Sequence, residues 1–154
     1  MLIEKKIARL LIAQKKTLSV AESCSGGLLC HRLTNIPGSS NFLKLGLVVY
    51  SNDAKIKFLK ISIQTLKKHG AVSQTVARQM AENVRKIFKT DFGIAITGIA
   101  GPGGGSPAKP VGLTFIALST NKKIVCRKFV FQGNRLSIKS QTVTQSFKML
   151  LKFL

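Results

Sequence analysis

Short apolar, β-prone runs that alternate with helical patterns constrain the fold of this chain more than any other feature. The first run covers 17–21 (Thr-Leu-Ser-Val-Ala) and the second covers 45–50. Gly26 and Gly27 lead from the first run into a helical pattern at 28–33, and Ser51 or Asn52 is a suitable cap for a helix over 51–60. Strands that alternate with helices in this way indicate an α/β fold with parallel strand pairs.

The remaining elements complete a mixed sheet. A third apolar run at 92–97 precedes a glycine-rich loop, and runs at 112–119 and 124–131 predict a hairpin. Four further helices are predicted: 2–16, one from Ser62 to near Gly70, one from Ser73 to Phe88, and one at the C-terminal end. With 154 residues, 45% of them hydrophobic, we expect one domain over 1–154, an α/β sandwich whose mixed central sheet is mostly parallel.

The charge balance is unusual, with 25 basic and 5 acidic residues and a formal net charge of +20. Such a surplus attracts nucleic acids, anionic lipids or phosphorylated metabolites. The basic residues are spread along the chain without a recognisable nucleic-acid-binding motif, so solvated surfaces are the simpler interpretation. No apolar run reaches the roughly 18 residues of a membrane span, and no signal peptide is evident, so we expect a cytoplasmic protein. The three cysteines lack metal-site spacing and are expected to be reduced.

Three segments are candidates for chemistry. Residues 21–27 (Ala-Glu-Ser-Cys-Ser-Gly-Gly) follow a predicted strand and precede a helix, where a nucleophile can lie beside unpaired N–H groups; a tight structural turn is the alternative. Residues 50–55 also join a strand to a helix, although Lys55 alone has the features of a solvated lysine. Residues 97–105 form a glycine-rich loop that serves either as a connection or as a ligand cradle. The carboxyl ends of strands share one edge of such a sheet, so these segments are expected to meet.

Other catalytic arrangements are poorly supported. The chain has only two histidines, and His31 and His69 both have structural interpretations within predicted helices. Two histidines and five scattered acids give no metal site, and none is expected. Glu22 and Asp53 are the only acids near the candidate segments, so chemistry by paired carboxylates is weakly supported.

Several motifs together resemble the CinA C-terminal domain family, in the same order as in that family. They are 21–27, 37–40 (Pro-Gly-Ser-Ser), 50–55 (Tyr-Ser-Asn-Asp-Ala-Lys), 69–73 (His-Gly-Ala-Val-Ser), and 97–105 with 109–112 (Lys-Pro-Val-Gly). The resemblance runs from about residue 2 to the C-terminus. It implies a three-layer α/β/α domain that removes ammonia from the amide of nicotinamide mononucleotide, without a cofactor or metal. It also implies the standalone form, without the N-terminal domain of longer relatives.

The resemblance assigns a Ser/Lys pair to Ser23 and Lys55, with Tyr50 orienting Lys55 or packing on the substrate. A serine hydroxyl needs an adjacent base, and a lysine is a base only when neutral, which requires a lowered pKa. Ser25 is the alternative nucleophile, and Cys24 is less favoured because its side chain should point away from the crevice.

The resemblance also implies the substrate contacts. The N–H groups around Ser25, Gly26 and Gly27 are expected to bind the oxyanion, while Thr97 and Gly98 with the following glycines hold the nucleotide. Arg135 is assigned to the phosphate, because its planar fork suits bidentate contacts.

Two positions depart from the family, and two other functions stay open. Ser25 stands where threonine is common, and Lys139 stands where a second arginine is usual. The expected partner is a small phosphorylated nucleotide, and self-association is expected. The first alternative is a catalytically altered protein of the same fold that binds a phosphorylated ligand. The second, less favoured, is a basic nucleic-acid-binding module.

Overall fold

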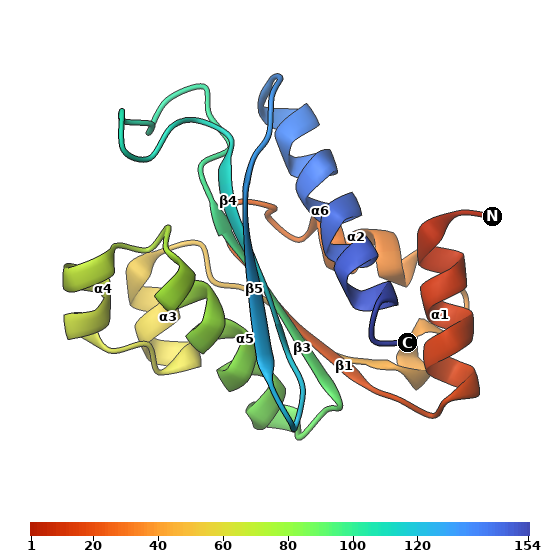
Figure 1. Ribbon diagram of the computed structural model, residues 1–154. Coiled ribbons are helices and arrows are strands. Elements are labelled where there is room, and N and C mark those ends of the chain that lie inside the picture. Colours follow the sequence, from red (N-terminus) through yellow and green to blue (C-terminus); the bar gives the residue numbers. More distant parts are fainter.

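A computed structural model describes residues 1–154 and contains helices and strands in the predicted order (Figure 1). The elements are α1 Ile3–Ala13, β1 Leu18–Glu22, α2 Leu28–Thr34, a 3₁₀ turn Ser39–Asn41, β2 Leu43–Val48, α3 Asn52–Leu59, α4 Ile63–His69, α5 Gln74–Phe88, β3 Phe92–Gly98, β4 Leu113–Ser119, β5 Ile124–Val130 and α6 Arg135–Leu151. None of these helices combines the length and the apolar character needed to cross a membrane.

The strands form one five-stranded sheet in the order β2-β1-β3-β4-β5. β1 pairs in parallel with both β2 and β3, whereas β4 pairs antiparallel with β3 and with β5. The sheet is therefore parallel around β1 and ends in the predicted hairpin. The expected α/β fold with a mixed central sheet is confirmed.

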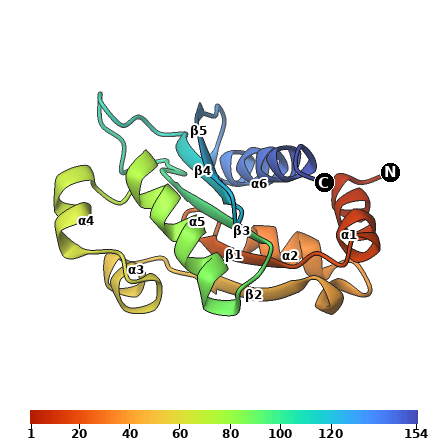
Figure 2. The same ribbon diagram turned by 60° about the horizontal axis from the view of Figure 1, so that its bottom comes forward.

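Helices cover both faces of the sheet, which gives the expected three layers. Figure 2 shows α3, α4 and α5 on one side and α1, α2 and α6 on the other. Two separate groups of buried apolar residues fill the spaces between the layers. One contains Ile7, Leu29 and Phe147 beside α1, α2 and α6, and the other contains Met80 and Val84 of α5.

Local signals explain where several helices begin. Ser51, Ser62 and Ser73 each accept a hydrogen bond from the backbone N–H three residues later, so each is an N-cap as predicted. The second predicted strand, 45–50, was placed two residues too late, because β2 covers Leu43–Val48. In the other four strands the predicted ends differ from the observed ones by at most one residue. Thr17 precedes β1, because its N–H and hydroxyl both donate to Asp91, and β4 begins after Gly112, which has a positive φ of 92°.

The topology brings the candidate segments to one edge of the sheet. The three parallel strands end there, with Glu22 of β1 opposite Val48 of β2 and Ile96 of β3. The chain turns outward from β1 to β2 on one side and to β3 on the other, so β1 lies next to the switch point where open α/β sheets bind ligands. Ser23 directly follows β1, and α6 begins at the same edge, after β5.

Close packing of α5 on β3 requires a glycine at position 93. A Cβ built there would lie 2.2 Å from the carbonyl oxygen of Ala81 and 2.6 Å from Cβ of Arg85, both in α5. We predict that Gly93→Ala lowers the free energy of unfolding by about 1–3 kcal/mol, because α5 must move away from the sheet.

Gly103→Ala is the matched control, because a Cβ at that loop position meets no atom within 4 Å. Its unfolding free energy should stay within about 0.5 kcal/mol of the wild type. Urea denaturation of the three proteins measures both values. Equal stabilities would contradict the tight contact between α5 and β3.

Candidate active site

Ser23 and Lys55 meet at the carboxyl edge of the sheet. Ser23 follows β1, and its backbone N–H donates to the carbonyl of Ile96 in β3 at 3.1 Å. Lys55 lies one turn into α3, and its Nζ donates to Oγ of Ser23 at 3.0 Å and to the carbonyl oxygen of Val49 at 2.9 Å. Ser23 is 8% exposed and Lys55 is 2% exposed. The structure thus brings together the two residues that the family resemblance assigned as a pair.

The environment of Lys55 favours its neutral form. The protein has only two ion pairs, Arg32–Glu4 and Lys86–Glu82, so no carboxylate compensates the buried ammonium. Burial lowers the pKa of Lys55 below its ordinary value, and the neighbouring Cys24 opposes that effect. A neutral amine at this position can accept the proton of the Ser23 hydroxyl.

Glu22 organises the turn that carries Ser23. This carboxylate is fully buried, and its oxygens accept hydrogen bonds from the N–H groups of Gly27, Leu29 and Cys30 at 2.9–3.1 Å. It therefore occupies the N-terminus of α2, where an anion is favoured by the unpaired N–H groups and the helix dipole. A substrate anion is accordingly excluded from that helix end.

The backbone N–H groups that lack an acceptor in the turn after Ser23 are not the ones that we expected. The Gly27 N–H is held by Glu22, and the Gly26 N–H donates to the carbonyl of Ser23 at 3.0 Å. The N–H groups of Cys24 and Ser25 have no acceptor within the protein, and the buried hydroxyl of Ser25 also lacks a partner. The donors available to a ligand thus lie one or two residues after Ser23.

The thiol of Cys24 is a poor nucleophile here. Cys24 is buried against Gly98, where an added Cβ would lie 3.0 Å from its sulfur. Burial raises the pKa of Cys24 to about 11, with a smaller contribution from the nearby Glu22. Thiolate is the reactive form of cysteine, so the hydroxyl of Ser23, bonded to Lys55, is the better candidate.

Arg135 joins three segments at the rim of the site. At the first residue of α6, its Nη1 donates to the carbonyl of Gly101 at 2.7 Å and its Nη2 donates to the hydroxyl of Tyr50 at 2.8 Å. Tyr50 makes no hydrogen bond to Lys55 and is 60% exposed, so it lies at the surface above the pair. Tyr50 and Arg135 therefore form one unit together with the glycine-rich loop.

Thr97 and Gly98 lie at the end of β3, beside the turn of residues 23–27, which we call the candidate catalytic turn. The buried Thr97 hydroxyl donates to the carbonyl of Ala71 at 2.8 Å, which ties β3 to the connection between α4 and α5. Gly98 packs on Cys24, and the loop beyond it is exposed from 102 to 108. Thr97 positions this corner of the site, and its hydroxyl proton is already engaged.

Lys139 is a second cation at the candidate catalytic turn. An added Cβ at Gly26 would lie 3.4 Å from its Nζ, and its side chain is half-buried without a carboxylate partner. The histidines lie elsewhere: His31 is exposed on α2 and contacts Asn35, and His69 ends α4. The sequence indicated that position 139 departs from the family pattern. It did not predict the role of Glu22, because an acid before a glycine-containing turn does not show which N–H groups it binds.

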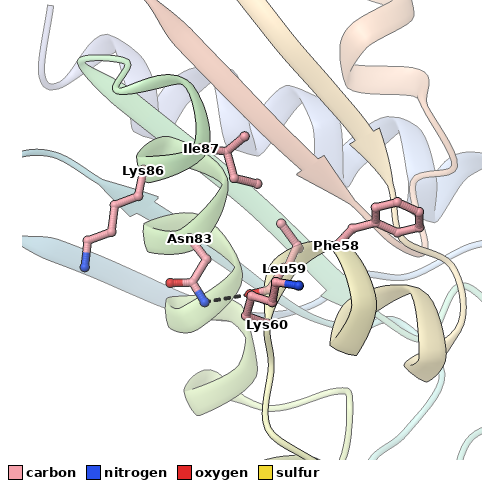
Figure 3. Close-up of a pocket in the computed structure, with 6 residues that line it drawn as sticks. All are labelled: Phe58, Leu59, Lys60, Asn83, Lys86 and Ile87. Carbon is pink, nitrogen blue, oxygen red and sulfur yellow. Dashed lines mark hydrogen bonds between the residues drawn. The ribbon is translucent and has the colours of Figure 1, made fainter.

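A surface pocket between α3 and α5 lies apart from this site. It has a volume of about 330 Å³ (Figure 3). Its lining residues are Phe58, Leu59, Lys60, Asn83, Lys86 and Ile87, and Asn83 donates to the carbonyl of Leu59 at 2.7 Å. None of them belongs to the candidate catalytic segments.

Removing the charge of Glu22 should destabilise the protein. We predict that Glu22→Gln lowers the unfolding free energy by about 1–3 kcal/mol, because charged hydrogen bonds to buried N–H groups are lost. The control is Glu82→Gln, which removes the exposed i,i+4 pair with Lys86 and should cost at most about 0.5 kcal/mol. Chemical denaturation distinguishes the two, and equal losses would contradict the helix-capping role of Glu22.

The lowered pKa of Lys55 should appear as a pH-dependent stability. Between its folded pKa and the unfolded value of about 10.4, the unfolded chain binds one more proton, so rising pH favours the folded state. We predict that the unfolding free energy of the wild type, relative to Lys55→Met, increases with pH by up to about 1.4 kcal/mol per pH unit in that window.

Urea denaturation of both proteins between about pH 7 and 10 tests this sign. If the stability difference is the same at every pH, Lys55 titrates as an ordinary lysine in the folded protein. That outcome would remove Lys55 as a candidate base.

Comparisons with known proteins identify the family. The sequence profile of the CinA C-terminal domain matches residues 2–154. A competence-damage inducible protein of Moorella thermoacetica is 51% identical over 149 residues, and a CinA-like protein of Syntrophus aciditrophicus is 48% identical over 153. These matches cover 97% and 99% of this chain but only 36% of each relative, so the chain spans about a third of their length.

Solved structures agree with this assignment. The competence/damage inducible protein of Agrobacterium tumefaciens is 38% identical, with a TM-score of 0.95 over 97% of this chain and 92% of that one. A competence-damaged protein (CinA) superfamily member from Escherichia coli is 32% identical, with a TM-score of 0.94 over 99% of this chain and 88% of that one. The fold, the motifs and the match over 2–154 lead to one conclusion: this chain belongs to the CinA C-terminal domain family.

Proposed function

We propose that this domain hydrolyses the carboxamide of nicotinamide mononucleotide to nicotinic acid mononucleotide and ammonia. The observation that carries the proposal is the 3.0 Å contact between Nζ of Lys55 and Oγ of Ser23, buried and without a carboxylate. A hydroxyl next to a lysine with a lowered pKa is suited to attack on a carbonyl carbon. The family resemblance supplies the identity of the amide.

The first half of the reaction forms an ester on Ser23. The neutral amine of Lys55 accepts the hydroxyl proton while Oγ attacks the carboxamide carbon, and the carbonyl oxygen becomes an oxyanion. The resulting ammonium then donates its proton to the departing nitrogen as the carbon–nitrogen bond breaks, releasing ammonia. In the second half, Lys55 accepts a proton from water, the hydroxide attacks the ester, and the proton returns to Oγ as the acid leaves.

The N–H groups of Cys24 and Ser25 are our proposed donors to the oxyanion. They follow the nucleophile and have no other acceptor, whereas those of Gly26 and Gly27 are already bonded within the protein. Glu22 holds the turn so that these donors do not need to reorganise during the reaction. Such preorganised donors make a large contribution to acyl-transfer catalysis.

The cations at the rim are suited to the phosphate of the nucleotide. Arg135 uses two of its N–H groups on Tyr50 and Gly101, and the guanidinium has further donors for an anion. Lys139 adds an unpaired ammonium beside the candidate catalytic turn. We propose that both contact the phosphate, and that Tyr50 and the glycine-rich segment from Gly98 border the nucleotide.

Ammonia release from nicotinamide mononucleotide by the purified protein tests the proposal. The wild type should release ammonia, and Ser23→Ala should reduce kcat at least about a thousandfold, because the nucleophile is absent. Ser25→Ala should retain most activity, since its backbone donor remains, and Ser140→Ala on the exposed side of α6 is the control.

The possible results separate the alternatives. Loss of activity in Ser25→Ala with survival in Ser23→Ala would transfer the nucleophile to Ser25. Absence of ammonia release by the wild type would overturn the proposed activity. Equal turnover of the mononucleotide and its dephosphorylated nucleoside would contradict the phosphate contacts.

A further inference from the structure

Lys109 lies in the connection of residues 99–112 between β3 and β4, which includes the glycine-rich loop, and its side chain is bonded to the end of a helix. Nζ of Lys109 donates to the carbonyl oxygen of His69, the last residue of α4, at 2.8 Å. We infer that Lys109 is a positioning residue that holds the glycine-rich loop in place for the substrate. The inference rests on the proposed function only for its effect on substrate, because the contact itself exists without it.

The contact satisfies both of its partners. The last carbonyl groups of a helix receive no hydrogen bond from an N–H group of the same helix, so they need another donor. A cation is favoured there, at the negative end of the helix dipole. Lys109 is half-buried and takes part in neither of the two ion pairs of the protein. The carbonyl of His69 is therefore the partner that keeps its ammonium in place.

Gly70 makes room for this ammonium. An added Cβ at position 70 would lie only 2.9 Å from Nζ of Lys109. The backbone at Gly70 has φ 74° and ψ 162°, a conformation that is essentially restricted to glycine. The residue after α4 is thus adapted to the approach of Lys109 through both its size and its conformation.

Two clamps hold the loop, one on each leg. The returning leg is fixed by Lys109, which also closes a small turn with Ser106, since the Ser106 N–H donates to the Lys109 carbonyl at 2.8 Å. The outgoing leg is fixed by Arg135, which donates to the carbonyl of Gly101. Between the clamps, residues 102–108 are all exposed. The direction of this exposed segment therefore depends on both contacts.

The segment bonded to Lys109 also borders the candidate catalytic turn. Ala71, two residues after His69, accepts the hydroxyl of Thr97, and the neighbouring Gly98 packs on Cys24. Lys109 makes no hydrogen bond to Ser23 or Lys55. Its loss should consequently alter how the loop meets the substrate, leaving the geometry of the Ser/Lys pair unchanged.

Lys109→Met tests the inference, because it keeps the apolar stem and removes the donor. Lys44→Met is the matched control, since Nζ of Lys44 in β2 also donates to a backbone carbonyl at 2.8 Å, that of Ser40 in the 3₁₀ turn. We expect Lys109→Met to accelerate hydrogen exchange of the Ser106 amide about tenfold in the free protein. We expect KM of Lys109→Met for nicotinamide mononucleotide to rise about tenfold, while kcat stays within about twofold of the wild type. Lys109→Arg should restore both the exchange rate of the Ser106 amide and KM.

Each measurement can overturn the inference. Unchanged exchange at Ser106 in Lys109→Met would show that Lys109 does not hold the loop. Faster exchange with unchanged KM would show that the held loop does not serve the substrate, and a fall in kcat alone would indicate a role in the chemistry. If the wild type releases no ammonia, the proposed function fails, and the exchange measurement still decides whether the clamp exists.

Discussion

The buried carboxylate of Glu22 is the interaction on which the site depends. By binding three N–H groups at the start of α2, it fixes the turn from Ser23 to Gly27 and neutralises the positive helix end. The carbonyl of the same residue accepts the N–H of Val49, whose own carbonyl binds Lys55. One residue at the end of β1 thus positions the hydroxyl, the segment that holds the amine, and the donors left free for a ligand.

The environment of Lys55 does not stabilise an ammonium group. A buried ammonium without a carboxylate is unfavourable, and the protein compensates it only with a serine hydroxyl and a carbonyl oxygen. Such a pair would add little to stability, but the same environment lowers the pKa of the amine. A carboxylate beside Lys55 would stabilise the ammonium and reduce its ability to accept a proton. The absence of that partner is therefore consistent with a base.

Local signals allowed the sequence to predict the elements, and the long-range contacts needed the structure. Apolar periodicity and the serine caps at 51, 62 and 73 depend on neighbouring residues, so these helices and the strand order in the chain were predictable. The pairing of Ser23 with Lys55 came from the family resemblance. The contacts of Glu22, Arg135 and Lys109 depend on how separate segments meet in space, and no spacing in the sequence encodes them. For the same reason the expected donors, Gly26 and Gly27, proved to be bonded within the protein.

The scarcity of acidic residues has a consequence at the site. Of the five acids, Glu4 and Glu82 form the two ion pairs, Glu22 caps α2, and Asp91 accepts from Thr17. Asp53 lies exposed in the first turn of α3, where the helix dipole favours it. No carboxylate is thus left to pair with Lys55, Lys139 or Arg135, and Lys55 and Arg135 donate to neutral groups instead. The net charge of +20 is spread along the sequence, and at this edge of the sheet it includes three cations without a carboxylate partner, one of which contacts the Ser23 hydroxyl.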